Sequence, residues 1–216
     1  GINGMGKTYY FNFLREALKE SNIRFNAEIN DDVHSGINKS IFDILLSTNS
    51  RFFDTGNPKM ETLLILAKQA NDEERFVLPS IREGQSIVSD RGFDTVAIVQ
   101  GIMLYRKYGG DLLQHINEVY KTAIKFNMIP NKTILFTGDF DKSLQRATLR
   151  DKQEYSKEEI EILKMESEIL HELSQREKDR FIVIDVDRDP IEIKSELVRV
   201  FKKILNCQIF FKKVLT

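Results

Sequence analysis

The first eight residues have the composition of a loop that binds phosphate. Residues 1–8, GINGMGKT, fit the pattern G-x-x-x-x-G-K-[ST] of the P-loop. Glycines let such a loop turn its backbone N–H groups toward a phosphate, and the following helix adds its positive N-terminal end. We expect Lys7 to reach the β- and γ-phosphates of a nucleotide and the Thr8 hydroxyl to ligate Mg²⁺. Further phosphate contacts are predicted at Gly1, Asn3, Gly4, Met5 and Gly6.

Phosphoryl transfer also requires a carboxylate near the metal and a cation on the acceptor phosphate. Three aspartates follow segments that are predicted to be strands: Asp90, Asp139 and Asp185. Asp90 is the preferred metal carboxylate because Arg91 follows it, and the two can serve Mg²⁺ and a substrate phosphate together. Asp139 is expected to cap a helix. Asp185 is expected either to lie near the base of the nucleotide or to end its strand.

Two arginines precede a polar segment that is suited to cover the phosphates. Arg146 and Arg150 are four residues apart, so they share one face of a predicted helix. We expect a short lid at about residues 146–158 that closes over the nucleotide and excludes water. A solvated helix face is the alternative for these arginines. Phe52 and Phe53, in a predicted loop, are expected either to anchor packing or to contact a base.

The overall composition is that of one soluble α/β domain. The chain has 216 residues, a net charge of −1 and a single cysteine. This charge balance does not favour nucleic acid or a membrane surface as a partner, and no apolar run approaches the roughly 18 residues of a membrane span. Cys207 alone excludes an internal disulfide and fits a reducing compartment, so we expect a cytoplasmic protein.

Apolar periodicity predicts strands that alternate with helices. Such alternation gives a parallel sheet covered on both faces, a three-layer α/β/α fold in a single domain, residues 1–216, with ligands bound beyond the carboxyl ends of the strands. The predicted strands are residues 23–29, 86–90, 133–136 and 181–185. The predicted helices are residues 7–21, 37–47, 60–83 with a bend at Pro79, 96–108, 112–126, 139–149, 156–178 and 190–205.

A P-loop normally follows a β-strand, but no residue precedes Gly1 in this sequence. Either the chain lacks N-terminal residues, or another segment takes the first strand position. The strand-like residues 209–215 are one such substitute, although missing residues are the preferred explanation.

Further residues resemble the thymidylate kinase family of nucleoside monophosphate kinases. Glu61 and the leucines that follow it are similar to the E-L-L-L that opens a helix in that family. Residues 89–91, Ser-Asp-Arg, are similar to its D-R motif. Other matches in the family's order are Pro79, Gly84, Gln100-Gly101, residues 130–150 and Ile184-Asp185. The similarity covers nearly the whole chain.

This resemblance implies a P-loop kinase fold with a five-stranded parallel sheet, and Mg²⁺-assisted transfer from ATP to a nucleoside monophosphate, dTMP to dTDP. It places Arg146 near adenine, makes Arg150 the lid arginine and adds Asp185 to the nucleotide site. Because the P-loop position that can carry an arginine is Met5, the lid must supply that cation, and Lys152 is a second lid candidate. The implied catalytic residues are Lys7, Asp90, Arg91 and Arg150. The family is commonly homodimeric.

The acceptor-side candidates are Asn3, Glu28, Phe52, Phe53, Gln69, Arg91 and Gln100; Phe52 and Phe53 are the loop aromatics named above, and the resemblance implies the others. Departures from the family pattern concentrate here. Asn3 replaces a frequent acidic residue, and Gln69 replaces the base-side arginine, although its amide can pair with a pyrimidine. The other departures are Ala27, Gly92 and Val99. The resemblance therefore supports ATP as donor more directly than dTMP as acceptor.

Other functions remain open alongside this one. A deoxynucleoside kinase or another pyrimidine monophosphate kinase would use the same donor site, but deoxynucleoside kinases usually carry E-R-S where this chain has residues 90–92, Asp-Arg-Gly. A non-catalytic, nucleotide-binding regulatory protein would hold ATP without releasing ADP. The presence of Lys7, Thr8, Asp90 and Arg91 together favours an enzyme.

Overall fold

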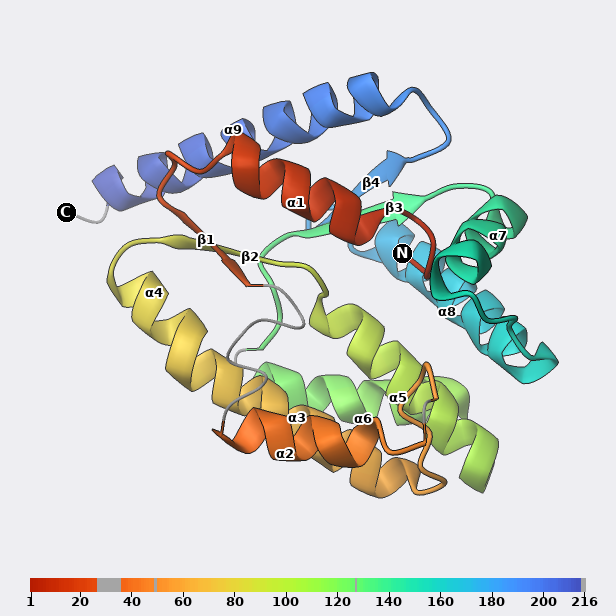
Figure 1. Ribbon diagram of the computed structural model, residues 1–216. Coiled ribbons are helices and arrows are strands. Elements are labelled where there is room, and N and C mark those ends of the chain that lie inside the picture. Colours follow the sequence, from red (N-terminus) through yellow and green to blue (C-terminus); the bar gives the residue numbers. More distant parts are fainter. Residues whose placement is uncertain (27–35, 49, 127, 215–216) are drawn as a thin grey trace.

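The strands form two parallel pairs (Figure 1). The computed structural model describes residues 1–26, 36–48, 50–126 and 128–214, with the backbone alone for 206–214. β1 (Ile23–Asn26) pairs with β2 (Ser86–Ser89), and β3 (Thr133–Thr137) pairs with β4 (Phe181–Asp185). In each pair the registers match from the first residue to the last, so the carboxyl ends of partner strands lie together.

The prediction of a single five-stranded sheet is wrong for the described residues, which form four strands in two separate pairs. Residues 1–6 add no strand to either pair. Gly4 and Gly6 adopt φ angles of 83° and 75°, and such left-handed conformations turn the chain away from extended pairing. Gly1 instead lies against β3, because a Cβ there would meet the carbonyl oxygen of Phe136 at 2.2 Å.

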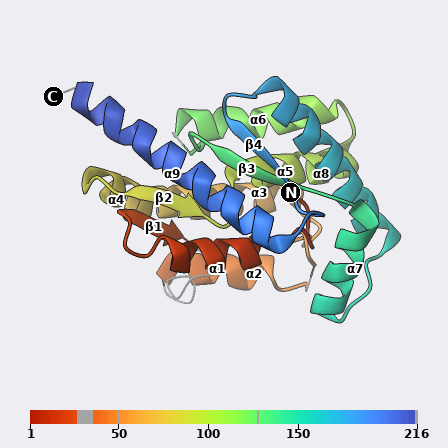
Figure 2. The same cartoon turned by 90° about the horizontal axis from the view of Figure 1, so that it is seen from above.

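Helices cover the strands from both sides (Figure 1). α1 and α9 lie on one side, and α3, α5, α6 and α8 lie on the other; Figure 2 shows α9 extending along its layer. The layered α/β prediction therefore agrees with the structure. The helices are α1 (Lys7–Ala17), α2 (Gly36–Leu45), α3 (Pro58–Asp72), α4 (Leu78–Arg82), α5 (Phe93–Tyr108), α6 (Leu112–Lys125), α7 (Phe140–Asp151), α8 (Lys157–Arg176) and α9 (Pro190–Val214). None of the helices described is long and apolar enough to cross a membrane.

The suggestion that residues 209–215 supply a strand is wrong, because α9 continues through Val214. Ile193, Leu197 and Phe201 are buried at a spacing of four residues, which is the period of one helix face. A short apolar run at the end of such a helix has the same composition as a strand, so local composition does not distinguish the two.

The long helix predicted at residues 60–83 is interrupted before Pro79 rather than bent at it. A π-helical turn, Glu73–Val77, joins α3 to α4. Pro79 has no N–H and cannot donate to the carbonyl of Arg75, so the regular helical bonding pattern is broken over the preceding turn.

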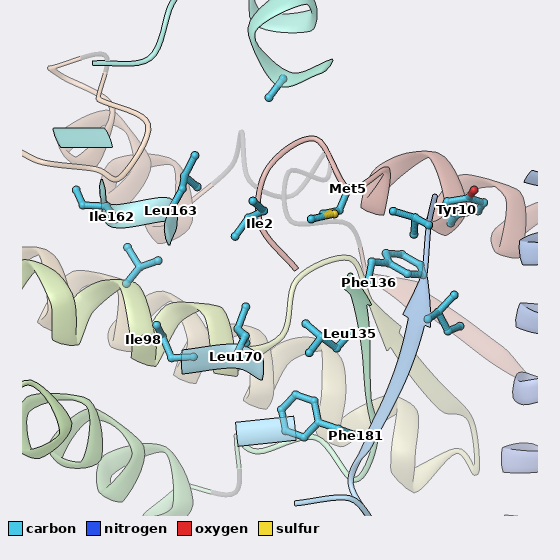
Figure 3. Packing of buried hydrophobic residues seen from close by; sticks show 14 of the residues in the cluster. Ile2, Met5, Tyr10, Ile98, Leu135, Phe136, Ile162, Leu163, Leu170 and Phe181 are labelled. Carbon is cyan, nitrogen blue, oxygen red and sulfur yellow. The ribbon is translucent and has the colours of Figure 1, made fainter. Parts of the chain in front are cut away.

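The P-loop is part of the main hydrophobic core (Figure 3). Ile2 and Met5 are 1% and 3% exposed and pack in the same cluster as Leu135 and Phe136 of β3. The ring of Tyr10 in α1 lies 5.3 Å from that of Phe136. The phosphate loop is therefore held between the first helix and β3 by apolar contacts on the loop itself.

A buried ion pair joins α5 to the second strand pair. The Arg180 guanidinium donates to both Asp94 carboxylate oxygens, at 2.9 and 2.8 Å, and Asp94 is 2% exposed. The hydroxyls of Tyr120 and Thr133 donate to the same carboxylate at 2.7 and 2.8 Å. Burial and the neighbouring Asp94 charge raise the pKa of Tyr120, which keeps its hydroxyl a donor. The Asp94 carboxylate of α5 thus connects that helix to α6, to β3 and to Arg180, the residue before β4.

Asp94→Ala should lower the free energy of unfolding by about 3–5 kcal/mol, because Arg180 would stay largely buried with only the more exposed Glu177 as a counter-charge. Urea unfolding followed by circular dichroism measures this change. Asp43→Ala is the control, because its ion pair with Lys39 is exposed and should contribute about 0.5 kcal/mol or less. Equal effects of the two substitutions would contradict the role assigned to the Asp94 cluster.

Candidate active site

The P-loop has the geometry that its glycines predict. Gly4 and Gly6 are left-handed, and a Cβ on Gly4 would lie 1.9 Å from the carbonyl oxygen of Ser143 in α7. Ser143 also donates from its hydroxyl to the Met5 sulfur at 3.2 Å. Met5 therefore turns its side chain into the core and offers no polar group to a phosphate. Glycine at position 4 is required both by its conformation and by the close approach of α7.

Lys7 lies at the start of α1 and reaches back over the loop. Its ammonium donates to the carbonyl oxygens of Gly1 at 2.6 Å and Ile2 at 2.8 Å. These contacts hold a positive charge against the first two residues of the loop, and Lys7 itself begins α1 at the positive end of the helix dipole. The arrangement suits an anion with several oxygens, as the motif predicts.

The side-chain oxygens of Thr8 and Asp90 lie together beside the P-loop, in a position that fits a divalent cation. The Thr8 hydroxyl donates to Oδ2 of Asp90 at 3.2 Å. The other oxygen, Oδ1, is buried and has no hydrogen-bond partner among the described residues. No group of three or more His, Cys, Asp or Glu side chains in the described chain could hold a metal. Magnesium, which prefers hard oxygen ligands and keeps water, fits Thr8, Asp90 and nucleotide phosphates together.

A pocket beside the loop collects almost all of the residues predicted for the acceptor side. Apolar side chains form much of its wall: Phe42, Leu45, Ile65, Val96 and Val99. The predicted residues that line it are Asn3, Phe52, Phe53, Gln69, Arg91 and Gln100. Their role in binding remains a prediction, and Glu28 lies outside the described residues. Most of the residues predicted from the sequence to bind the acceptor therefore lie around one pocket of the structure.

Phe52 and Phe53 both pack against other aromatic or apolar side chains and also line the pocket, while their contact with a base remains a prediction. Phe52 is 6% exposed and belongs to the main core cluster, yet it also lines the pocket. Phe53 packs edge-on against Phe42, with ring centroids 6.0 Å apart. Its φ of 59° is rare for a bulky residue, so the surrounding contacts must hold the loop in this shape.

Glu166 of α8 is a pocket residue that the sequence prediction missed. It is 3% exposed and lines the pocket with Arg91. Burial raises the pKa of Glu166, while the positive charges of Lys7 and Arg91 act in the opposite direction. A signal was present in the sequence, since Glu166 interrupts an apolar row between Ile162 and Leu170 at four-residue spacing. A carboxylate on the buried face of a helix needs nearby cations.

Arg146 and Asp185, the two residues expected near the nucleotide base, are connected by Asp187, which was not predicted. Arg146 donates to Asp187 at 3.3 Å, and the backbone N–H of Asp187 donates to Asp185 at 2.9 Å. Asp139 caps α7 by accepting from the N–H of Lys142 at 2.8 Å, which confirms its predicted role. Arg146 and Asp185 therefore lie at one place, at the carboxyl end of β4.

The predicted lid segment consists of the end of α7, a short turn and the start of α8. Lys152 leaves α7 in a left-handed conformation, and a capping box between Ser156 and Glu159 begins α8. Arg150 donates to both oxygens of Asp151 at 2.7 and 3.1 Å, which lowers the pKa of that carboxyl. The lid arginine is thus held by its own neighbour. Closure of the segment over a nucleotide remains a prediction.

Comparison with known proteins identifies the chain's relatives. The family model described as thymidylate kinase matches residues 1–197. The chain belongs to the thymidylate kinase family. It is 27% identical to a probable thymidylate kinase of Methanococcoides burtonii over 95% of both chains. It is 31% identical to a thymidylate kinase of Maridesulfovibrio salexigens over 91% of this chain and 90% of that one.

Family membership confirms the resemblance drawn from the sequence and the enzyme class that it implied. It also gives the P-loop α/β fold to the chain. The departures at Asn3, Ala27, Gln69, Gly92 and Val99 remain features of this chain within the thymidylate kinase family. Asn3, Gln69 and Val99 line the pocket, and Ala27 lies outside the described residues.

The raised pKa of Glu166 predicts a pH dependence of stability. A carboxyl whose folded pKa exceeds its ordinary value of 4.5 binds more protons in the folded state, so its contribution to stability falls as the pH rises from 4.5 through the folded pKa. Glu166→Gln should therefore gain stability relative to the wild type as the pH rises through that window, in urea unfolding at several pH values. Glu161→Gln, an exposed change on the same helix, is the control. Identical pH profiles for Glu166→Gln and the wild type would contradict this prediction.

Proposed function

We propose that the protein transfers the γ-phosphoryl group of ATP to dTMP and forms dTDP, with Mg²⁺ at the transferred group. The observation that carries the proposal is the junction of two sites at one loop. Asn3 belongs to the P-loop and also lines the acceptor pocket, and Arg91 of that pocket follows Asp90, which accepts from Thr8. A donor phosphate in the loop and an acceptor phosphate at Arg91 would therefore be neighbours.

The residues at this junction have the charges that direct transfer requires. Lys7 and the N–H groups of the loop hold the donor phosphates, and Arg91 orients the acceptor phosphate so that its oxygen attacks in line. Thr8 and Asp90 would hold Mg²⁺, which would neutralise charge on the phosphates. Arg150 supplies a cation from the lid once the segment covers the site, and Lys152 is a second one. Excluding water there favours the nucleotide acceptor over hydrolysis.

The wall of the pocket supports a flat pyrimidine as the acceptor base. Phe42, Phe53 and Val96 offer apolar and aromatic surfaces to a ring. Gln69 contributes an amide, and Lys68 contributes an ammonium that is 2.6 Å from Asp72 and 8% exposed as a residue. Amide and ammonium donors suit the carbonyl oxygens of thymine. Lys68 and Gln69 thus take the place of the arginine that the resemblance leads one to expect.

The remaining expectations form part of the same proposal. The protein acts as a single kinase domain over residues 1–216 with a lid at about 146–158, in the cytoplasm and as a homodimer. ATP and Mg²⁺ are the cofactors, and a nucleoside monophosphate is the substrate. Neither nucleic acid nor a membrane is a partner.

The test of the function is a coupled assay of ADP release with ATP, Mg²⁺ and a panel of acceptors: dTMP, dUMP, UMP, CMP, AMP, GMP and thymidine. We expect rapid release with dTMP and slower or no release with the others. Preference for thymidine would indicate a deoxynucleoside kinase, and preference for another monophosphate would change the acceptor. ATP binding with no release for any acceptor would overturn the proposal in favour of a non-catalytic binding protein.

Lys7→Ala should reduce kcat by about 10²–10³-fold, because one preorganised charge contact to the transferred group is lost. The same coupled assay with dTMP measures the change. Lys39→Ala, which removes an exposed lysine in α2, is the control and should retain wild-type turnover. Turnover of Lys7→Ala close to that of the wild type would exclude Lys7 from the transfer step.

A further inference from the structure

Arg51 connects the acceptor pocket to the lid segment. It lies in the loop between α2 and α3, lines the pocket, and its side chain is 10% exposed. Its guanidinium contacts two carboxylates of the lid region. Nε lies 3.5 Å from Asp151, and Nη1 donates to both oxygens of Glu159 at 3.2 Å. The Arg51 side chain therefore connects the wall of the pocket to the segment that is predicted to cover the nucleotide.

The same guanidinium also holds the turn between α7 and α8 through its backbone. Nη2 donates to the carbonyl oxygen of Gln153 at 2.8 Å, and Nη1 donates to that of Glu154 at 3.3 Å. The face of the guanidinium lies 3.9 Å from the ring centre of Tyr155, which is 8% exposed. A planar, forked cation is needed to satisfy two carbonyls, two carboxylates and a ring face at once. Lysine, with one ammonium, does not have this geometry.

These contacts lead directly to the lid arginine and to the P-loop. Asp151 forms an ion pair with Arg51 and also accepts two hydrogen bonds from Arg150. The Tyr155 hydroxyl donates weakly to Asp151 at 3.5 Å and accepts from Asn3 at 3.4 Å. The cluster thus places the lid cation relative to the phosphate loop.

Arg51 is also attached to the pocket through the chain. Phe52 and Phe53 follow it directly, and both line the pocket. Phe53 holds a left-handed backbone conformation that few bulky residues adopt, so the loop at this point has little freedom to shift independently. A ligand that fills the pocket therefore contacts a loop whose neighbouring side chain holds the lid.

We propose that Arg51 is a positioning residue that couples occupancy of the acceptor pocket to the placement of the lid arginine, Arg150. Arg51 does not touch the transferred phosphoryl group. It fixes Asp151 and the turn at 153–154 against the pocket wall. Arg150 is thereby placed over the phosphates when the acceptor is bound. This inference rests on the proposed kinase function and assigns the coupling to a side chain outside the motifs of the family resemblance.

The experiment compares Arg51→Ala, Arg150→Ala and the double variant in the ADP-release assay, using the full chain, ATP and dTMP. Misplacement of a catalytic group by about 1 Å can cost up to 10²-fold in rate. We expect Arg51→Ala to lower kcat by about 10–100-fold while the KM for ATP changes little. Because Arg51 acts through Arg150, the double variant should be no slower than Arg150→Ala alone.

Conservative and matched variants separate this role from a general effect on folding. Arg51→Lys keeps the charge but loses the fork, so it should not restore kcat. Glu159→Gln removes one carboxylate charge yet can still form the capping box of α8, so it should lower kcat in the same direction with the helix intact. Arg106→Ala breaks another bridge to α8, to Glu161 at 2.7 Å, and should leave kcat unchanged.

Independent, multiplicative losses in the Arg51 and Arg150 variants would overturn the coupling, as would full activity of both Arg51→Ala and Glu159→Gln. If circular dichroism shows that Arg51→Ala is unfolded, the kcat values of Glu159→Gln and Arg51→Lys decide whether the coupling holds. These outcomes are distinct from failure of the proposed function. In that case the wild type itself releases no ADP with any acceptor.

Discussion

The site depends on the burial of two apolar side chains within the phosphate loop. Ile2 and Met5 pack into the main core and fix the path of a segment that carries two left-handed glycines. Left-handed glycines gain freedom in the unfolded chain, so the folded loop must be held by other contacts. Because Ile2 and Met5 anchor the loop in the core, its backbone and Lys7 are available to a phosphate.

Charge balance in the acceptor pocket follows from that placement. A loop that carries Lys7 lies close to Arg91, and two cations near one another in a partly buried site need a counter-charge. Glu166 of α8, which also lines the pocket, is the acidic residue that interacts electrostatically with both of them. An incoming phosphate brings the negative charge that these cations attract most strongly. The charges of Lys7 and Arg91 therefore oppose the effect of burial on the Glu166 carboxyl.

Local geometry that follows from short motifs could be predicted from the sequence. The P-loop, the pair Asp90–Arg91 and the cap at Asp139 belong to short motifs or strand ends. The role of Arg51 could not be predicted, because its partners lie about a hundred residues away and meet it only after packing. The alternative of a strand at residues 209–215 is wrong because composition alone cannot separate a short apolar helix end from a strand. The five-stranded sheet had a different source: the resemblance implied a fifth strand, whereas the residues themselves predicted four, and the described residues form four in two pairs.

The measurement that tests the account most directly follows the phosphoryl group itself. In a single turnover with γ-³²P-labelled ATP, Mg²⁺ and excess dTMP, the products are separated after rapid quenching. If the loop and the pocket form one centre for direct transfer, the label appears in dTDP at the rate at which ATP disappears, and none is bound to protein. Label in inorganic phosphate, or on the protein before it reaches the nucleotide, would contradict direct transfer between the two sites.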